Sequence, residues 1–147
     1  MANQDDERIN VEAHSENTQI MIVDDEEEIL KLMQHSLQDN EHNVAVFSDA
    51  ENAIEEIKKE AYDLIITDLK MPKLSGIEFV KMVKTISPKT DLIVMTGYPS
   101  IETAVECMKL GATDYIVKPL DLEYLNIIPP CSIFVSNHFS TSCVNFI

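Results

Sequence analysis

Charged and hydroxyl side chains follow the ends of four short apolar runs in this sequence. In chain order, each run and the polar residues after it are Ile20–Val23 with Asp24 and Asp25, Leu64–Thr67 with Asp68, Leu92–Met95 with Thr96, and Tyr115–Val117 with Lys118. If the runs are parallel strands, their carboxyl ends meet at one edge of a sheet, where ligands bind in open α/β folds. The sequence therefore predicts that three carboxylates, one hydroxyl and one ammonium line a single pocket.

These residue types together suit the chemistry of a phosphorylated carboxylate. Clustered carboxylates repel one another unless a cation neutralises them, and Mg²⁺ takes one or two carboxylates together with phosphate oxygens. Asp68, alone at the end of a central strand, is the candidate nucleophile, because aspartate can form an acyl phosphate. The Lys118 ammonium and the Thr96 hydroxyl would each hold a phosphoryl oxygen, and Lys118 would pair with Asp68 before phosphorylation.

Each of these residues also has an ordinary structural explanation. Asp24 and Asp25 can cap a helix that follows them. Asp68 can be a turn residue, and Lys118 before Pro119 can be a solvated side chain at a turn. Their joint occurrence, in order, at four strand ends is what favours the pocket.

Composition narrows the classes of protein that this chain can be. Its 147 residues suit one domain with a real core. A net charge of -15, from 26 acidic and 11 basic residues, argues against direct contact with nucleic acid. The sequence contains no run of about 18 apolar residues, so no membrane span is expected. The polar N-terminus does not resemble a secretion signal. Three cysteines, an odd number, suit reduced thiols in a cytoplasmic protein.

Strand and helix patterns alternate five times between Gln19 and about Leu125. The expected strands are 20–23, 44–47, 64–67, 92–95 and 115–117. The first expected helix covers about 26–38, the second is capped by Ser48 or Asp49, and Gly76 opens the third. The fourth covers about 100–110, and a short fifth helix over 122–127 is capped by Asp121. Short connections imply an α/β fold: a doubly wound, flavodoxin-like, five-stranded parallel sheet of order 2-1-3-4-5 with helices on both faces.

Helical spacing predicts which residues of three helices face the core. The predicted sets are Ala50, Ala53, Ile54, Ile57 and Ala61; then Phe79, Met82, Val83 and Ile86; and then Ile101, Ala104, Val105 and Met108, with Gly111 as a left-handed stop.

The two ends of the chain differ in composition from the middle. Residues 1–18 are polar and acidic without periodicity, which predicts a mobile tail before a domain over 19–127. Residues 128–147 form an atypical uncharged tail, and Pro129-Pro130 ends the last helix early. This tail suits an added strand or an intermolecular contact, or is the product of a truncated or shifted reading frame.

Residues from about 19 to 125 resemble the receiver domain of bacterial two-component response regulators. The matching stretches are IMIVDDEEEI, DLIITDLKMPKLSGIEFV and LIVMTGYPSIETAVECMKLGATDYIVKPL. The run MTGYPSIETAVECMKLGATDYIVKP is most similar to receivers of sigma-54-dependent transcription activators. The resemblance implies a phosphoacceptor module, not an enzyme, whose self-dephosphorylation is at most slow.

The resemblance also assigns roles at the predicted pocket. It implies that Asp68 accepts a phosphoryl group from a histidine kinase or a phosphotransfer protein. It implies that Asp25, Asp68 and the backbone carbonyl of Lys70 bind Mg²⁺, or Mn²⁺ in its place, with Asp24 acting mainly through water. Thr96 would bind a phosphoryl oxygen.

Further roles concern the switch that phosphorylation would drive. The resemblance implies that Lys118 is the salt-bridge partner, that the Lys118-Pro119 bond is cis, and that Tyr115 turns inward when Thr96 moves toward the phosphoryl group. A half-buried packing role is the alternative for Tyr115. The candidate surface for self-association is the face of the fourth helix, fifth strand and fifth helix.

Lys70 and Tyr98 lie two residues after Asp68 and Thr96. We expect them to flank the acyl phosphate, where the ring and the lysine stem would restrict attacking water and lengthen the phosphorylated lifetime. Both are otherwise ordinary surface side chains.

The ATPase and DNA-binding domains that usually follow such a receiver have no counterpart in this sequence.

Two other functions compete with the receiver. One is a phosphohydrolase that uses Asp68 as nucleophile on a small phosphoester, but the dehalogenase-type enzymes want an aspartate two residues on, where this chain has Lys70, and a cap insertion. The other is a nucleotide-binding or structural α/β domain. No GxGxxG or GxxxxGK[ST] motif follows the first strand, so a glycine-loop phosphate site is not supported.

Overall fold

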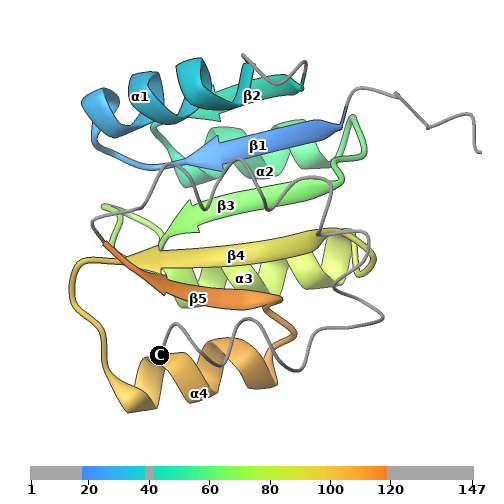
Figure 1. The fold of residues 1–147 in the computed structure, drawn as a ribbon. Helices are drawn as coiled ribbons and strands as arrows, with labels where there is room; N and C mark the ends of the chain where they lie inside the picture. The colour runs from blue at the N-terminus through green and yellow to red at the C-terminus, as the bar shows by residue number, and fades with distance from the viewer. Residues whose placement is uncertain (1–17, 39–41, 119–147) are drawn as a thin grey trace, which may run out of the picture.

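The computed structural model describes residues 18–38 and 42–118, which form a parallel five-stranded sheet with helices on both faces (Figure 1). The elements are β1 Gln19–Val23, α1 Glu27–Gln38, β2 Asn43–Phe47, α2 Ala50–Ile57, β3 Leu64–Asp68, α3 Gly76–Ile86, β4 Asp91–Thr96, α4 Ile101–Lys109 and β5 Asp114–Val117. The strand order is β2-β1-β3-β4-β5. The predicted fold class and strand order are confirmed.

The central strands β3 and β4 are largely apolar between their ends, as expected of strands that helices cover on both faces. Residues Leu64 to Thr67 of β3 are buried, and so are residues Leu92 to Met95 of β4. The register pairs Val23 of β1 with Thr67 of β3. In the next two pairs, Asp68 of β3 lies opposite Met95, and Thr96 lies opposite Val117. The strand ends therefore lie at one edge of the sheet, as the site requires.

Each face of the sheet has its own core. The α1 residues Leu30, Met33 and Leu37 pack against alternate residues of the sheet, such as Ile22 and Ile66. The other face packs against α2, α3 and one residue of α4, Cys107. Figure 1 shows α1 on one side of the strands, α2 and α3 on the opposite side, and α4 beyond β4 and β5.

Three helices begin at the side chains that the sequence favours for capping. Asp49, rather than Ser48, caps α2 and accepts hydrogen bonds from the backbone N–H groups of Glu51 and Asn52. Ser75 caps α3, which Gly76 opens as predicted, and Ser100 caps α4. After α4, Gly111 has a φ of 103°, the left-handed conformation expected for a helix stop.

The predicted inward face of α4 is wrong. Ile101 is 84% exposed, Val105 46% and Met108 40%, Ala104 is half-buried, and Cys107 is the buried residue of this helix. Helix α4 packs at the β5 side of the sheet, so only a narrow strip of it reaches the core. The apolar spacing identified a real stripe on the helix, but that stripe faces solvent.

Two smaller predictions of core residues are also wrong. Ala61 is exposed because α2 ends at Ile57, so the helical spacing does not extend to it. Met82 is 38% exposed, and Val80 fills the core beside Phe79 instead. The predicted helix over 122–127, residue Pro119 and the predicted tails, apart from Thr18, lie outside the described residues.

No helix in the described part of the chain is long and apolar enough to cross a membrane.

Gly76 allows the loop after β3 to close tightly on the start of α3. Its N–H donates to the Leu69 carbonyl at 2.9 Å, and a Cβ at Gly76 would lie 2.5 Å from the Cα and O atoms of Leu69. Such a contact with backbone forces a shift of the loop.

We predict that Gly76→Ala lowers the free energy of unfolding by about 1–3 kcal/mol, measured by urea denaturation. Gly97→Ala is the matched control, because a Cβ there meets nothing within 4 Å. Equal stability of the two variants would contradict the close approach at Gly76.

Candidate functional site

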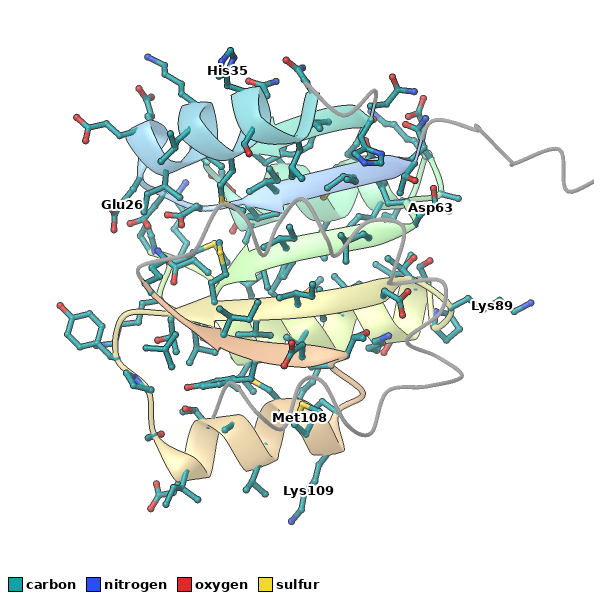
Figure 2. All side chains as sticks on the ribbon, in the orientation of Figure 1. Glu26, His35, Asp63, Lys89, Met108 and Lys109 are labelled. Carbon is teal, nitrogen blue, oxygen red and sulfur yellow. The ribbon has the colours of Figure 1, made fainter. Side chains whose placement is uncertain are left out.

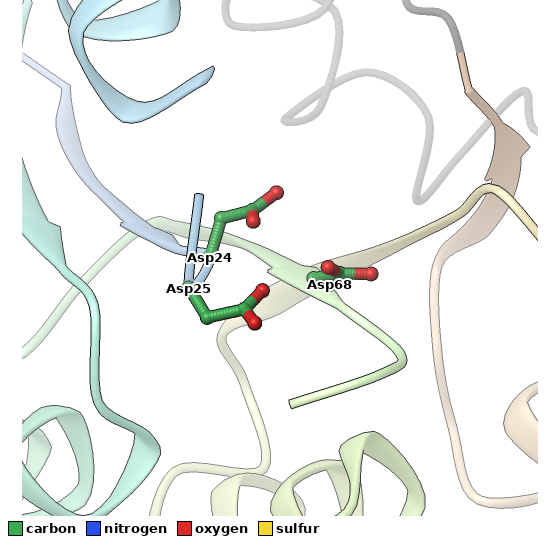
Figure 3. Close-up of side chains that lie close together, drawn as sticks. All are labelled: Asp24, Asp25 and Asp68. Atoms are coloured by element: carbon green, nitrogen blue, oxygen red, sulfur yellow. The ribbon is translucent and has the colours of Figure 1, made fainter. Parts of the chain in front are cut away.

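Three aspartates converge beyond the carboxyl ends of β1 and β3. Asp24 and Asp25 directly follow β1, and Asp68 is the last residue of β3, the neighbouring strand. One carboxylate oxygen from each lies within 4.8 Å of the other two. Figure 3 shows the three carboxylates gathered at this edge of the sheet. The structure therefore brings together the acidic residues that the sequence singled out.

The three carboxylates differ in their access to water. Asp24 is fully buried and Asp68 is 5% exposed, whereas Asp25 is exposed. Burying ionised carboxylates is costly unless they are paired and hydrogen-bonded. The cluster is thus a buried pair of acids with one solvent-facing acid beside it.

Lys118 provides the positive charge for the two buried acids. Its Nζ donates to Oδ2 of Asp24 at 2.9 Å and to Oδ2 of Asp68 at 3.1 Å. The backbone N–H of Lys118 donates to the Thr96 carbonyl at 2.8 Å, which fixes the start of the side chain just beyond β5. The lysine therefore reaches across the end of β4 to β3 and β1.

The remaining oxygens of the two buried acids accept backbone hydrogen bonds. Oδ1 of Asp24 accepts from the N–H of Glu26 at 2.9 Å, just before α1. Oδ1 of Asp68 accepts from the N–H of Lys70 at 3.3 Å. Each carboxylate thus has one oxygen on Lys118 and one on the backbone, so its orientation is fixed from both sides.

Burial by itself lowers the pKa of the Lys118 ammonium, but the hydrogen bonds and charges of Asp24 and then Asp68 outweigh it. The net effect is a pKa above the ordinary value for lysine. Lys118 therefore stays charged at neutral pH, and one ammonium serves both carboxylates.

The charges of the cluster do not balance without a further cation. Three carboxylates and one ammonium, -3 + 1, leave a charge of -2 when all are ionised. The donors are all oxygens, and exposed Asp25 leaves room for water ligands. A small divalent ion such as Mg²⁺, which keeps several waters and takes one or two carboxylates, fits this donor set.

Thr96 and Tyr115 lie on the face of the sheet that packs against α4. Thr96 is fully buried at the end of β4, and its Oγ1 accepts a hydrogen bond from the N–H of Tyr98 at 3.0 Å. Tyr115 is half-buried in β5, and its hydroxyl lies 2.8 Å from Oγ1 of Thr103 in α4. The Tyr115 hydroxyl also accepts from the N–H of Ser100 at 3.4 Å.

Lys70 and Tyr98 contact each other above the site. The Lys70 Nζ lies 3.8 Å from the centroid of the Tyr98 ring, and the Tyr98 side chain is 70% exposed. The pair connects the loop after β3 with the loop after β4, so it lies beside the end of Asp68's strand.

Residues at the opposite end of the sheet from the site can serve as controls. Figure 2 shows Glu26 at the carboxyl ends of the strands, whereas Asp63 and Lys89 lie at the opposite edge. Asp63 precedes β3 and accepts a hydrogen bond from the N–H of Gln19. It is therefore a suitable control position, because it lies just before the strand that ends at Asp68, at the opposite end of the sheet from the site.

Sequence reasoning did not single out Thr103, nor the hydroxyl contacts of Ser100. The available signal was the Ser-x-x-Thr spacing at the start of α4, a capping pattern in which the Ser100 side chain accepts from the N–H of Thr103 at 3.1 Å. The contact of both residues with Tyr115 depends on how α4 lies against β5.

The chain belongs to the response regulator receiver domain family, which it matches over residues 20–128. Receiver domains are the phosphoacceptor modules of two-component signal transduction systems. Their partners are histidine kinases or phosphotransfer proteins, and they bind Mg²⁺ at an acidic pocket.

Curated relatives include the transcriptional regulatory protein ZraR of Escherichia coli K12, which is 36% identical over 110 residues. That alignment covers 75% of this chain and 25% of ZraR. The regulatory protein AtoC of the same strain is 35% identical over 111 residues, covering 74% of this chain and 24% of AtoC. The chain thus spans about a quarter of the length of these relatives.

Solved structures with the same fold include the beryllofluoride-activated NtrC4 receiver domain dimer, with a TM-score of 0.72 and 30% identity over 76% of this chain and 92% of that one. Another is the chemotaxis protein CheY4 of Vibrio cholerae, with a TM-score of 0.71 and 34% identity over 76% of this chain and 94% of that one. The predicted similarity to receivers of sigma-54-dependent activators is confirmed by the relatives.

Proposed function

We propose that Asp68 accepts a phosphoryl group from a phosphohistidine of a sensor kinase or phosphotransfer protein, in a reaction that needs Mg²⁺. The observation that carries this proposal is the shared ammonium: Lys118 binds Asp68 and Asp24 at 3.1 and 2.9 Å in a cluster that still has a charge of -2. Such a site neutralises an incoming phosphoryl group only together with a divalent cation.

The transfer would exchange one bond to phosphorus for another. A carboxylate oxygen of Asp68 bonds to phosphorus while the bond from phosphorus to the imidazole nitrogen breaks and the nitrogen keeps the electron pair. Positioning and neutralisation of charge account for most of the catalysis of phosphoryl transfer. Lys118, already in place, would bind one phosphoryl oxygen, and the Thr96 hydroxyl would donate to another.

The metal ligands in this proposal are Asp25, Asp68 and the backbone carbonyl of Lys70, with Asp24 acting through water. Bound Mg²⁺, or Mn²⁺ in its place, would supply positive charge to the phosphoryl oxygens. Asp24 is fully buried and each of its two oxygens accepts one hydrogen bond, which supports its indirect role.

Phosphorylation would act on the α4 and β5 side of the molecule. Thr96 would leave the N–H of Tyr98 and move toward the phosphoryl group, and Tyr115 would turn into the space left behind. The exposed apolar side chains of Ile101, Val105 and Met108 on α4 make this face the candidate surface for self-association or output.

The function that we propose for this chain is that of a signalling module rather than a metabolic enzyme. Lys70 stands two residues after Asp68, where a dehalogenase-type phosphohydrolase would want an acidic group, so turnover of a small phosphoester is not favoured. Any loss of the phosphoryl group would be slow self-dephosphorylation. The net charge of -15 supports protein partners in the cytoplasm rather than nucleic acid or a membrane surface.

We predict that acetyl phosphate with Mg²⁺ adds one phosphoryl group to the intact protein, detected by mass spectrometry, and that EDTA prevents it. Asp68→Asn should abolish the addition, because the amide is not a nucleophile at phosphorus. Asp63→Asn, just before the start of the strand that Asp68 ends, should leave it unchanged. Steady release of inorganic phosphate without a phosphorylated protein would favour the hydrolase.

We also propose that the Tyr98 ring and the Lys70 stem limit the access of water to the acyl phosphate. Their contact at 3.8 Å supports this role. Tyr98→Ala should speed dephosphorylation by about 2–5-fold, the equivalent of one exposed cation–π contact. Lys70→Met, which keeps the stem, should change the rate less, and Ile101→Ala is the control for truncating an exposed side chain nearby. An unchanged rate in Tyr98→Ala would exclude this role.

A further inference from the structure

Three hydroxyl groups connect β5 with the first turn of α4. The hydroxyl of Tyr115 lies 2.8 Å from Oγ1 of Thr103, which in turn lies 2.8 Å from Oγ of Ser100, the N-cap of the helix. The N–H of Ser100 also donates to the Tyr115 hydroxyl at 3.4 Å. The aromatic side chain is therefore bound to the cap of α4 through its oxygen.

Two backbone N–H groups of the loop before α4 donate hydrogen bonds to the two residues that the switch would move. In the loop between β4 and α4, the N–H of Tyr98 donates to the Thr96 hydroxyl and the N–H of Ser100 donates to the Tyr115 hydroxyl. Movement of Thr96 toward a phosphoryl group would free the first amide, and rotation of Tyr115 would free the second. The loop is thus held at both ends by the switch residues.

Helix α4 has little else to hold its first turn. It has nine residues, and Cys107 near its end is the buried one, whereas Ile101 at its start is 84% exposed. Losing a serine or threonine cap destabilises a helix, and this helix has only a small buried face to hold it in place.

We propose that Thr103 is a positioning residue for the switch: its hydroxyl holds Tyr115 against the cap of α4 and so favours the unphosphorylated arrangement. The inference rests on the proposed function, because it assigns Tyr115 a part in the response to phosphorylation. Rotation of Tyr115 breaks the contact with Thr103 and removes the acceptor of the Ser100 amide, so α4 loosens at its start when the side chain turns.

The strength of this contact sets the size of the expected effect. One hydrogen bond contributes roughly 0.5–1.5 kcal/mol, so its loss raises a minor conformation about 2–12-fold. The population of the conformation in which Tyr115 has turned away from Thr103, the one we expect to be phosphorylated, should rise by that factor when Thr103 loses its hydroxyl.

The test uses the full chain labelled with 3-fluorotyrosine and observed by ¹⁹F NMR, with the Tyr115 signal assigned from Tyr115→Phe. Beryllofluoride with Mg²⁺ serves as the phosphoryl mimic. In Thr103→Val without this mimic, the Tyr115 signal should shift toward its position in the mimic-bound wild type. Hydrogen exchange at the Ser100 amide should become faster, and phosphorylation by acetyl phosphate should speed about 2–12-fold.

Two variants control for the substitution itself. Thr103→Ser keeps a hydroxyl and should behave like the wild type. Thr85→Val makes the same change on α3, where the threonine hydroxyl donates to the Lys81 carbonyl of its own helix and has no other hydrogen-bond partner among residues 18–38 and 42–118. It should leave the Tyr115 signal, the Ser100 amide and the rate unchanged.

The outcomes separate this inference from the proposed function. If Thr103→Val matches Thr85→Val in the Tyr115 signal and in exchange at Ser100, Thr103 does not hold Tyr115 and the inference is wrong. If the wild type does not respond to beryllofluoride and is not phosphorylated, the proposed function fails, and with it the switch. In that case the signal in the two valine variants still shows whether the hydroxyl contact exists.

Discussion

The sharing of one lysine by two buried carboxylates is the interaction on which the site depends. Lys118 reaches Asp24 and Asp68 only because β5, β4, β3 and β1 end at the same edge, in the order that the sheet gives them. The carboxylates stay buried because their remaining oxygens accept backbone hydrogen bonds. With Asp25 beside them, the charge remains negative by two, so the fold builds a site that favours a divalent cation and a bound anion together.

The hydrogen bonds that surround this cluster connect it with α4. Thr96 ends the strand between Asp68 and Lys118, and its hydroxyl binds the loop that leads to the helix. Tyr115, on the same face of the sheet, binds the other end of that loop. In the proposed switch, a charge change at Asp68 would reach α4 through these two hydroxyl groups, and few core contacts hold this helix in place.

Sequence reasoning identified the strand ends but not the surroundings of α4. Short apolar runs followed by Asp24, Asp68, Thr96 and Lys118 predicted that these side chains meet, because parallel strands place their ends together. The strand order was predicted from the alternation of strands and helices with short connections. The spacing of Ile101, Val105 and Met108 showed that they share a helix face, but spacing does not determine what lies opposite that face. The contact of Thr103 with Tyr115 depends on the placement of α4, so only the structure revealed it.

The charge of the cluster is tested most directly by the affinity of the unphosphorylated protein for Mg²⁺, measured by isothermal titration calorimetry in the wild type and three variants. We predict one Mg²⁺ per wild-type chain, loss of binding in Asp25→Asn, and tighter binding in Lys118→Met, because removal of the ammonium changes the charge from -2 to -3. Lys89→Met, at the far edge of the sheet, should bind like the wild type. Unchanged or weaker binding in a folded Lys118→Met protein, or full binding in Asp25→Asn, would contradict the account.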